Sequence, residues 1–309
     1  MKNGIVLRST GSWYEVLNLE EDQIYTCRLR GKLKLKGTKV TNPIAVGDRV
    51  KLEIEDTFEK KGLIFEVVPR DNYIIRKSPH KTNHGHIIAA NIDQAILIAT
   101  LVYPRTSLGF IDRFLVAAES FRIPAVVAFN KKDILNDDLI GLFEELKLMY
   151  EKIGYKSLLI SAETGENLSD FQDLLKGKKS LLSGHSGVGK STILNRLLPD
   201  LNLKTGEISD FAEKGIHTTT FAEMFRVDKD TFVIDTPGIK ELGLIDIDTE
   251  EISHFFPEMR NLFNECRFYN CTHIHEPGCA VIQAVQNEEI DISRYESYLS
   301  MRDDDDNRR

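Results

Sequence analysis

Residues 1–70 alternate between apolar and polar positions in short runs, which is the pattern of half-buried β-strands. The alternation predicts five strands, at residues 4–8, 13–17, 25–30, 49–55 and 63–68. Gly, Asn and Pro occupy the turns between them, and no long segment of helical periodicity interrupts the series. Short strands punctuated in this way favour a small β-barrel at the N-terminal end of the chain.

The pattern changes after about residue 73, where buried-strand runs begin to alternate with segments of 3.6-residue periodicity. We expect strands at residues 91–102, 125–130, 158–161, 180–184 and 231–235, and helices at residues 108–121, 138–153, 168–175 and 190–198. This alternation indicates βαβ units around a parallel sheet covered on both faces. We expect residues 76–86, which include three basic residues and three histidines, to form a mobile linker.

Composition and charge narrow the classes of protein. The chain has 309 residues, 41% hydrophobic and 28% charged, which is an ordinary globular composition with room for two or three domains. Its longest apolar runs, such as residues 95–102, are far shorter than the roughly 18 residues of a membrane span, and we find no signal-peptide core. We therefore expect a cytoplasmic, monomeric protein without a membrane partner. The net charge is −8, but residues 1–70 carry +3 and the remainder −11.

A phosphate-binding loop is predicted between the expected strand at 180–184 and the helix at 190–198. The motif G-x-x-x-x-G-K-[ST] is filled by Gly184, His185, Ser186, Gly187, Val188, Gly189, Lys190 and Ser191, and Thr192 follows. Glycines let successive backbone N–H groups turn toward phosphates, and the helix N-terminus adds positive potential. We expect Lys190 to reach the β- and γ-phosphates and the Ser191 hydroxyl to bind Mg²⁺.

A second loop points to guanine as the base. The residues after the strand at 125–130 are Asn130, Lys131, Lys132 and Asp133. A carboxylate such as that of Asp133 accepts two hydrogen bonds from guanine N1–H and its amino group, a pair of donors that adenine lacks. Ser161 and Ala162, after the next strand, offer a backbone N–H to guanine O6. Alone, the loop of residues 130–133 is equally well explained as a polar turn, and residues 161–162 are a still weaker signal.

Two further segments have the character of nucleotide-sensing switches. Asp235 ends an expected strand and begins D-T-P-G, in which the carboxylate holds Mg²⁺ and the Gly238 N–H senses the γ-phosphate. Between the phosphate loop and Asp235 lies G-I-H-T-T-T at residues 215–220. Here Thr219, with Thr218 a close second, is the candidate for Mg²⁺ and the γ-phosphate. Together the five segments predict a GTPase.

The order of these motifs is unusual, because the guanine-reading loop precedes the phosphate loop. A circular permutation explains it, since a doubly wound domain tolerates one when its original termini lie close together. With this order the chain resembles the circularly permuted RsgA family, also known as YjeQ or YloQ, over essentially its whole length. The resemblance implies an OB-fold barrel (residues 1–70), a permuted GTPase domain (71–242) and a helical zinc-binding domain (243–309). It also implies GTP hydrolysis stimulated by the 30S ribosomal subunit, in late maturation of that subunit, with 16S rRNA as a binding partner.

The cysteines cluster near the C-terminal end. Cys266, Cys271 and Cys279 lie within fourteen residues together with His273, and a Cys₃His set is a closed tetrahedral shell for structural zinc. His275 and His254 compete as ligands, and the family spacing favours His273. The remaining cysteine, Cys27, falls in an expected strand and is expected to fill the barrel core.

A run of basic residues lies in the N-terminal barrel. Arg28, Arg30, Lys32, Lys34 and Lys36 alternate with other residues, so in a strand they share one face. Adjacent like charges suit an RNA backbone, whose phosphates are recognised without regard to sequence. The alternatives are a solvated edge strand protected by lysines, or two strands broken at Gly31 or Gly37.

The catalytic residue is the least determined part of the prediction. Many GTPases place a Gln just after D-x-x-G to orient water, but here Ile239 holds that position. His217 is our candidate, since an imidazole accepts a proton from water near neutral pH, and the family is also thought to use it. His185 is the alternative, as is completion of the site by the ribosome. Competing classes are a P-loop phosphotransferase and a non-enzymatic GTP-binding RNA and zinc protein.

Overall fold

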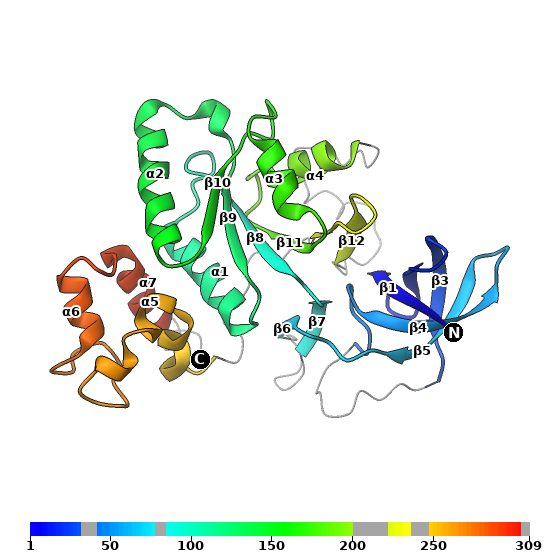
Figure 1. Ribbon diagram of the computed structural model, residues 1–309, viewed down its shortest axis with the longest axis horizontal. Helices are drawn as coiled ribbons and strands as arrows, with labels where there is room; N and C mark the ends of the chain where they lie inside the picture. The colour runs from blue at the N-terminus through cyan, green and yellow to red at the C-terminus, as the bar shows by residue number, and fades with distance from the viewer. Residues whose placement is uncertain (32–41, 78–84, 200–221, 236–246, 304–309) are drawn as a thin grey trace.

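The computed structural model describes residues 1–31, 42–77, 85–199, 222–235 and 247–303 (Figure 1). The strands are β1 (Lys2–Ser9), β2 (Tyr14–Asn18), β3 (Gln23–Leu29), β4 (Arg49–Asp56), β5 (Lys61–Val67), β6 (Tyr73–Lys77), β7 (Gly85–Ala90), β8 (Gln94–Ala99), β9 (Ala125–Phe129), β10 (Lys156–Leu159), β11 (Lys179–Ser183), β12 (Glu223–Arg226) and β13 (Phe232–Asp235). The helices are α1 (Leu108–Ser120), α2 (Asp137–Lys152), α3 (Leu168–Leu175), α4 (Lys190–Leu197), α5 (Pro257–Arg260), α6 (Ala280–Gln286) and α7 (Ile292–Asp303), with 3₁₀ turns η1 (Lys132–Ile134), η4 (Thr249–Phe255) and η5 (Phe263–Glu265). Within these ranges no helix combines the length and the apolar character needed to cross a membrane.

Strands β1 to β5 close into a barrel. Their order is β1-β2-β3-β5-β4, and β4 pairs back onto β1. The pairing of β3 with β5 is parallel and the others are antiparallel. Alternate side chains point inward, and the core contains Val6, Tyr14, Val16, Tyr25, Cys27, Ile44, Val50, Leu52 and Ile64. The predicted five-stranded barrel is therefore confirmed, and Cys27 is a fully buried core residue within it.

The central part is a sheet in the order β10-β9-β8-β11-β13-β12, parallel except for the edge strand β12. Helices α1 and α2 belong to the apolar cluster on one face, and α3 and α4 to the cluster on the other. Strand β8 is buried along its whole length because both faces are covered. The arrangement is the doubly wound sheet that the sequence predicts.

The C-terminal helices pack against α1 rather than against the sheet (Figure 1). Their apolar cluster includes Val116 of α1 together with Ile252, Phe256, Met259, Val281, Tyr298 and Met301. The predicted helical segment after residue 250 is therefore anchored mainly on α1, with further contacts to α2.

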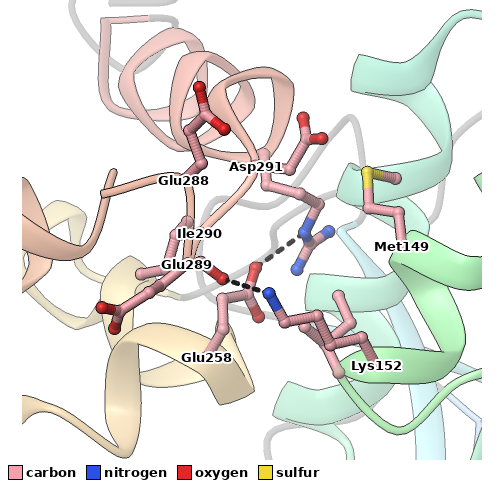
Figure 2. Close-up of a pocket in the computed structure, with 9 residues that line it drawn as sticks. Met149, Lys152, Glu258, Glu288, Glu289, Ile290 and Asp291 are labelled. Atoms are coloured by element: carbon pink, nitrogen blue, oxygen red, sulfur yellow. Dashed lines mark hydrogen bonds and ion pairs between the residues drawn. The ribbon is translucent and has the colours of Figure 1, made fainter. Parts of the chain in front are cut away.

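A buried ion cluster joins the same two parts. Arg294 of α7 is 1% exposed, and it donates to Asp112 of α1 at 2.7 Å and to Glu258 of α5 at 2.7 Å. The Tyr150 hydroxyl donates to the same Asp112 oxygen at 3.0 Å. A pocket of about 110 Å³ lies beside this cluster. In it, Lys152 of α2 donates to the Glu289 carbonyl (Figure 2). Arg294 thus pairs with one oxygen of each of two carboxylates from different parts of the chain.

Strand β1 is buried on both sides. Val6 faces the barrel core, whereas Ile5 and Leu7 belong to the apolar cluster of the central sheet. Strand β1 also pairs with β12, so the barrel and the central sheet form one continuous sheet. The barrel and the central domain therefore share part of their cores.

Two expectations about the N-terminal half need correction. The linker expected at residues 76–86 is in part a β-hairpin, because β6 ends at Lys77 and β7 begins at Gly85, with residues 78–84 outside the described ranges. The basic run at 28–36 is not one unbroken strand. Strand β3 ends at Leu29, and Gly31 has the left-handed φ of 69° that favours glycine.

Candidate nucleotide site and metal cluster

The loops predicted to bind nucleotide follow the carboxyl ends of neighbouring parallel strands, the usual place for ligands in such sheets. Residues 184–189 connect β11 to α4, and two glycines there are required by the packing. Gly184 has a φ of 145°, and a Cβ on it would lie 2.4 Å from the Ile98 carbonyl oxygen. Gly189 has a φ of 97°, and a Cβ on it would lie 2.3 Å from Asn130 Nδ2. The loop is therefore wedged between the ends of β8 and β9.

The ammonium of Lys190 turns back into this loop. It donates to the carbonyl oxygens of Gly184 at 2.5 Å and of His185 at 2.8 Å. Burial lowers the pKa of Lys190, and the charge of Asp235 opposes that shift. A phosphate in the loop would replace these carbonyl partners with charged ones, which are stronger acceptors for an ammonium.

Other members of the loop differ in exposure. Val188 and Ser191 are buried, Thr192 is half-buried, and Ser186 and Gly187 are exposed. The imidazole of His185 lies 3.7 Å from the ring of Phe110 in α1, measured between ring centroids. His185 thus packs against a helix of the central domain.

Asn130 connects three of the predicted segments. Its Nδ2 donates to the Val188 carbonyl of the phosphate loop at 2.8 Å, and its Oδ1 accepts from the Ala162 N–H at 2.9 Å. Asn130 is 3% exposed, so both bonds are shielded from water. The carbonyl of Ala162 accepts in turn from Arg196 of α4 at 3.1 Å. The guanine-type loop, the residues 161–162 and the phosphate loop are therefore held in one arrangement.

Asp133 and the lysines beside it have distinct partners. Ser161 Oγ donates to Asp133 Oδ1 at 2.5 Å, which holds the carboxylate in place. Lys131 has a left-handed φ of 69°, and its ammonium donates to the Tyr103 carbonyl. Lys132 forms an ion pair with Glu166 at 2.5 Å. Asp133 is thus oriented by Ser161, while Lys131 is directed toward a further loop.

That further loop, residues 100–106, was not predicted to belong to the site. Its Pro104 side chain borders Gly187, at 3.4 Å from the position of a Cβ there, and the Tyr103 carbonyl receives the Lys131 ammonium. The loop is closed by Thr106, whose Oγ1 accepts from the Thr100 N–H at 3.0 Å. Its only signal in the sequence is that it follows β8, another parallel strand of the same sheet.

On the magnesium side, Asp235 lies at the end of β13 and pairs in register with Leu182 of β11 and Glu223 of β12. Burial raises the pKa of Glu223, the charge of Arg8 lowers it, and the charges of Glu15 and Asp235 raise it. The chemistry of Asp235 and the Ser191 hydroxyl fits Mg²⁺, which prefers oxygen ligands. The predicted residues Thr218, Thr219, His217, Gly238 and Ile239 lie outside the described residues.

The predicted metal ligands come together in space. The ligand atoms of Cys266, Cys271, His273 and Cys279 all lie within 4.8 Å of one another. His273 Nδ1 is 3.7 Å from Cys266 Sγ and 3.4 Å from Cys279 Sγ. Zinc bonds of about 2.3 Å to sulfur and 2.0–2.1 Å to nitrogen in a tetrahedron place such atoms about 3.5–3.8 Å apart. The cluster therefore fits a zinc ion, with Nδ1 as the histidine ligand atom.

Surrounding residues fix this cluster, and sequence reasoning did not find them. The His273 ring stacks on Phe263 at 5.0 Å, and the Tyr295 hydroxyl donates to the His273 carbonyl at 2.7 Å. Burial acts to raise the pKa of Glu276, but hydrogen bonds from Thr272 and from backbone N–H groups hold it well below its ordinary value. His254 packs edge-on against Phe263 and His275 is exposed, so neither alternative ligand joins the cluster.

The basic residues of the barrel are described only in part. Arg28 and Arg30 are exposed on the barrel, 3.4 Å from Glu55 and 3.5 Å from Glu53. These carboxylates on β4 neutralise part of the positive charge expected there. Lys32, Lys34 and Lys36 lie outside the described residues.

Comparisons with known proteins agree with this architecture. Family models described as "RsgA GTPase" and "RsgA N-terminal domain" match residues 67–245 and 3–64. A protein of Cytophaga hutchinsonii named small ribosomal subunit biogenesis GTPase RsgA is 52% identical over 298 residues, covering 96% of this chain and 97% of that protein. One of the same name from Bacteroides fragilis is 48% identical over 301 residues, covering 97% and 96%.

Two solved structures are similar over the whole chain. YjeQ from Thermotoga maritima has a TM-score of 0.80 and 36% identity, and covers 100% of this chain and 99% of its own. YloQ, described as a circularly permuted GTPase, has a TM-score of 0.79 and 29% identity, with coverage of 100% and 96%.

Proposed function

The chain belongs to the RsgA family of GTPases, and from this premise we propose that it hydrolyses GTP on the small ribosomal subunit during late maturation of that particle. The observation that carries the proposal is the position of Asn130, which bridges the phosphate loop and residues 161–162. Such a bridge holds the base-binding loops at a fixed distance from the phosphate loop, as binding of a guanine nucleotide requires. A kinase-type phosphotransferase has no need of it.

Each loop then has a role. The Asp133 carboxylate accepts from the guanine base. The Ala162 N–H, which donates to Asn130 Oδ1 in this structure, is the candidate donor to guanine O6 when nucleotide binds. Residues 184–192 enclose the phosphates, with Lys190 on their negative charge. Mg²⁺ is held through Ser191, Thr219 and Asp235, and it neutralises charge on the phosphates when bound. Gly238 senses the γ-phosphate.

We assign the positioning of the attacking water to His217, since Ile239 offers no hydrogen bond. The His217→Ala variant should lose turnover stimulated by the small subunit while its affinity for GTP stays nearly the same. That separation is measured by fluorescent-nucleotide titration beside phosphate release. Equal loss of both would assign His217 a structural role instead.

Zinc and RNA complete the proposed function. Cys266, Cys271, His273 and Cys279 hold one structural zinc ion, which fixes the C-terminal segment. Arg28 and Arg30, with Lys32, Lys34 and Lys36, contact the 16S rRNA backbone. The functional units are a barrel (residues 1–70), a GTPase domain (71–242) and a zinc domain (243–309), and the protein acts as a cytoplasmic monomer.

The decisive experiment measures GTP hydrolysis by the purified chain alone, with 30S subunits and with 50S subunits. Strong stimulation by 30S only, absent in a Lys190→Ala variant, is the expected result. GTP binding without stimulation by either particle would favour a non-enzymatic GTP-binding assembly factor. Equal use of ATP would favour a phosphotransferase.

A further inference from the structure

The N-terminal barrel covers the β12 edge of the GTPase sheet. One edge of β12 pairs with β13, and its other edge pairs with β1 of the barrel. In the chain, β12 comes directly after the G-I-H-T-T-T segment, and β13 ends at Asp235, where the second switch motif begins. The barrel therefore contacts the strand that connects the two candidate switches.

A row of charged residues crosses this junction. Arg8 of β1 is in register with Glu15 of β2 on one side and with Glu223 of β12 on the other. Glu223 is in turn in register with Asp235 of β13. Residues directly opposite one another on adjacent strands have Cβ atoms about 4.5–5.5 Å apart, so their charges interact. Arg8 thus lies between two carboxylates, one of which neighbours the magnesium-side Asp235.

The far end of β12 is held by the barrel as well. Arg226 forms an ion pair with Asp22, in the turn between β2 and β3. Between the two ends, Met224 belongs to the same apolar cluster as Ile5 and Leu7 of β1. Strand β12 is therefore attached to the barrel at its start, its middle and its end.

From this geometry we propose that Arg8 and Asp22 are positioning residues for GTP binding and hydrolysis: they fix β12, and through it Asp235, so that the barrel occupies a different place in the GTP-bound and GDP-bound states. The proposal rests on the proposed function for the identity of the nucleotide.

The packing explains why the barrel must follow β12. Domains joined by a small polar interface move independently, whereas a shared apolar core opposes independent motion. Here the two parts share both a sheet and an apolar cluster. A displacement of β12 that accompanies Mg²⁺ and γ-phosphate binding therefore carries β1 and the barrel with it.

The test measures the distance between the two parts in the isolated, zinc-loaded, full-length chain. Fluorophores are placed through bioorthogonal amino acids at positions 58 and 148, whose side chains are 95% and 68% exposed, so the zinc thiols stay unlabelled. We expect the transfer efficiency to differ between GDP and a non-hydrolysable GTP analogue. In the double variant Arg8→Ala, Asp22→Asn the difference should become smaller, because only the apolar contacts of Ile5, Leu7 and Met224 then hold β12 on the barrel. The ratio of analogue to GDP affinity should change by about 3- to 10-fold.

Two controls separate positioning from general damage. Lys51→Ala removes a barrel cation whose ion pair, with Glu66 at 2.8 Å, lies within the barrel, and it should leave the distance change intact. Arg8→Lys in place of Arg8→Ala in the double variant keeps the charge at position 8 and should restore part of the nucleotide dependence.

The proposal is overturned if the wild-type distance is the same in both nucleotide states, or if the double variant retains the full change. Failure of the proposed function has a different signature. In that case the distance would still respond to GTP analogue, but 30S subunits would not stimulate hydrolysis.

Discussion

At the scale of single residues, the site depends on side chains that connect loops rather than on those that motif patterns single out. The sequence motifs locate residues 130–133, 161–162 and 184–191 correctly as neighbours at one sheet edge. They do not predict that Asn130 would bridge the three loops, or that Tyr103 would receive Lys131. These contacts join positions far apart in sequence, and only the folded sheet brings them together.

The bridging role of Asn130 predicts a broad loss of nucleotide binding in Asn130→Ala. The variant leaves the Val188 carbonyl and the Ala162 N–H without their buried partner, and each such loss costs about 1–3 kcal/mol. We expect affinities for GTP and GDP to fall together, by about 10- to 100-fold. Titration with fluorescent nucleotides measures this. Asn136→Ala, which removes only the N-cap of α2, should leave both affinities unchanged.

Asp133 should determine which base is accepted. Xanthine carries a carbonyl where guanine carries its amino group, so an amide at position 133 matches xanthine and a carboxylate matches guanine. Asp133→Asn should therefore weaken GTP binding by about 100-fold or more and gain binding of XTP. The amide N–H of Asn would face the amino group of guanine, donor against donor, and leave both without an acceptor. Competition between the two nucleotides provides the measurement. Unchanged preference for GTP would remove Asp133 from base recognition.

At the scale of elements, periodicity predicted the regular helices and strands well and the junction elements poorly. Helix α3 has the expected bounds, and α1 differs from its expected range by one residue. Strands β6, β7 and β12 were missed. Strand β12 has only four residues, and its polar ends face the barrel through Glu223 and Arg226. A strand that short has no detectable period and depends on its neighbours.

The buried Arg294 cluster predicts a large stability difference between two similar substitutions. Arg294→Met leaves Asp112 and Glu258 buried without a cation, which costs about 3–5 kcal/mol. Arg260→Met breaks an ion pair with Glu119 that also joins the C-terminal segment to α1 but is half-exposed, so it should cost about 0–1 kcal/mol. Urea unfolding compares the two. Equal losses would show that the cluster is no more important than a surface pair.

The metal cluster predicts that zinc binding and pH are linked. Without zinc, burial raises the pKa of the Cys271 thiol to about 12; the backbone N–H of His273 opposes this shift, and the neighbouring Cys279 and Cys266 add to it. That thiol is protonated at neutral pH, and zinc binds the thiolate, so binding releases a proton. Zinc affinity should therefore rise with pH and fall in acid. Calorimetry in buffers of different ionisation enthalpy counts the protons released, and a pH-independent affinity would contradict the assignment.

At the scale of the whole molecule, the barrel and the GTPase sheet should unfold together. Leu7 of β1 is 6% exposed within the apolar cluster of the central sheet, so Leu7→Ala should destabilise both parts by about 2–4 kcal/mol. Leu19, in the same barrel but 52% exposed, should tolerate alanine within about 0.5 kcal/mol. Thermal unfolding followed by separate probes on the two parts measures this. Two separate transitions would show that the shared core is not cooperative.

The way in which the barrel docks on the GTPase sheet could not be predicted from the sequence. Motif order predicted a permuted GTPase domain between a barrel and a zinc cluster, and these parts are present. Which barrel strand docks on which sheet edge was not predictable, because edge pairing depends on surfaces that form only after each part has folded. The apolar outer face of β1, with Ile5 and Leu7, was the one available clue.

The docking of β1 on β12 has a consequence for how a bound particle could influence this chain. Binding equilibria that share one conformational change are reciprocal, so a partner that holds the barrel alters GTP affinity by the factor by which GTP alters affinity for that partner. The affinity for GTP would then depend on the surface to which the barrel is bound. A change in the shape of that surface during assembly would be converted into a change in the affinity for GTP, without any new contact at the nucleotide itself.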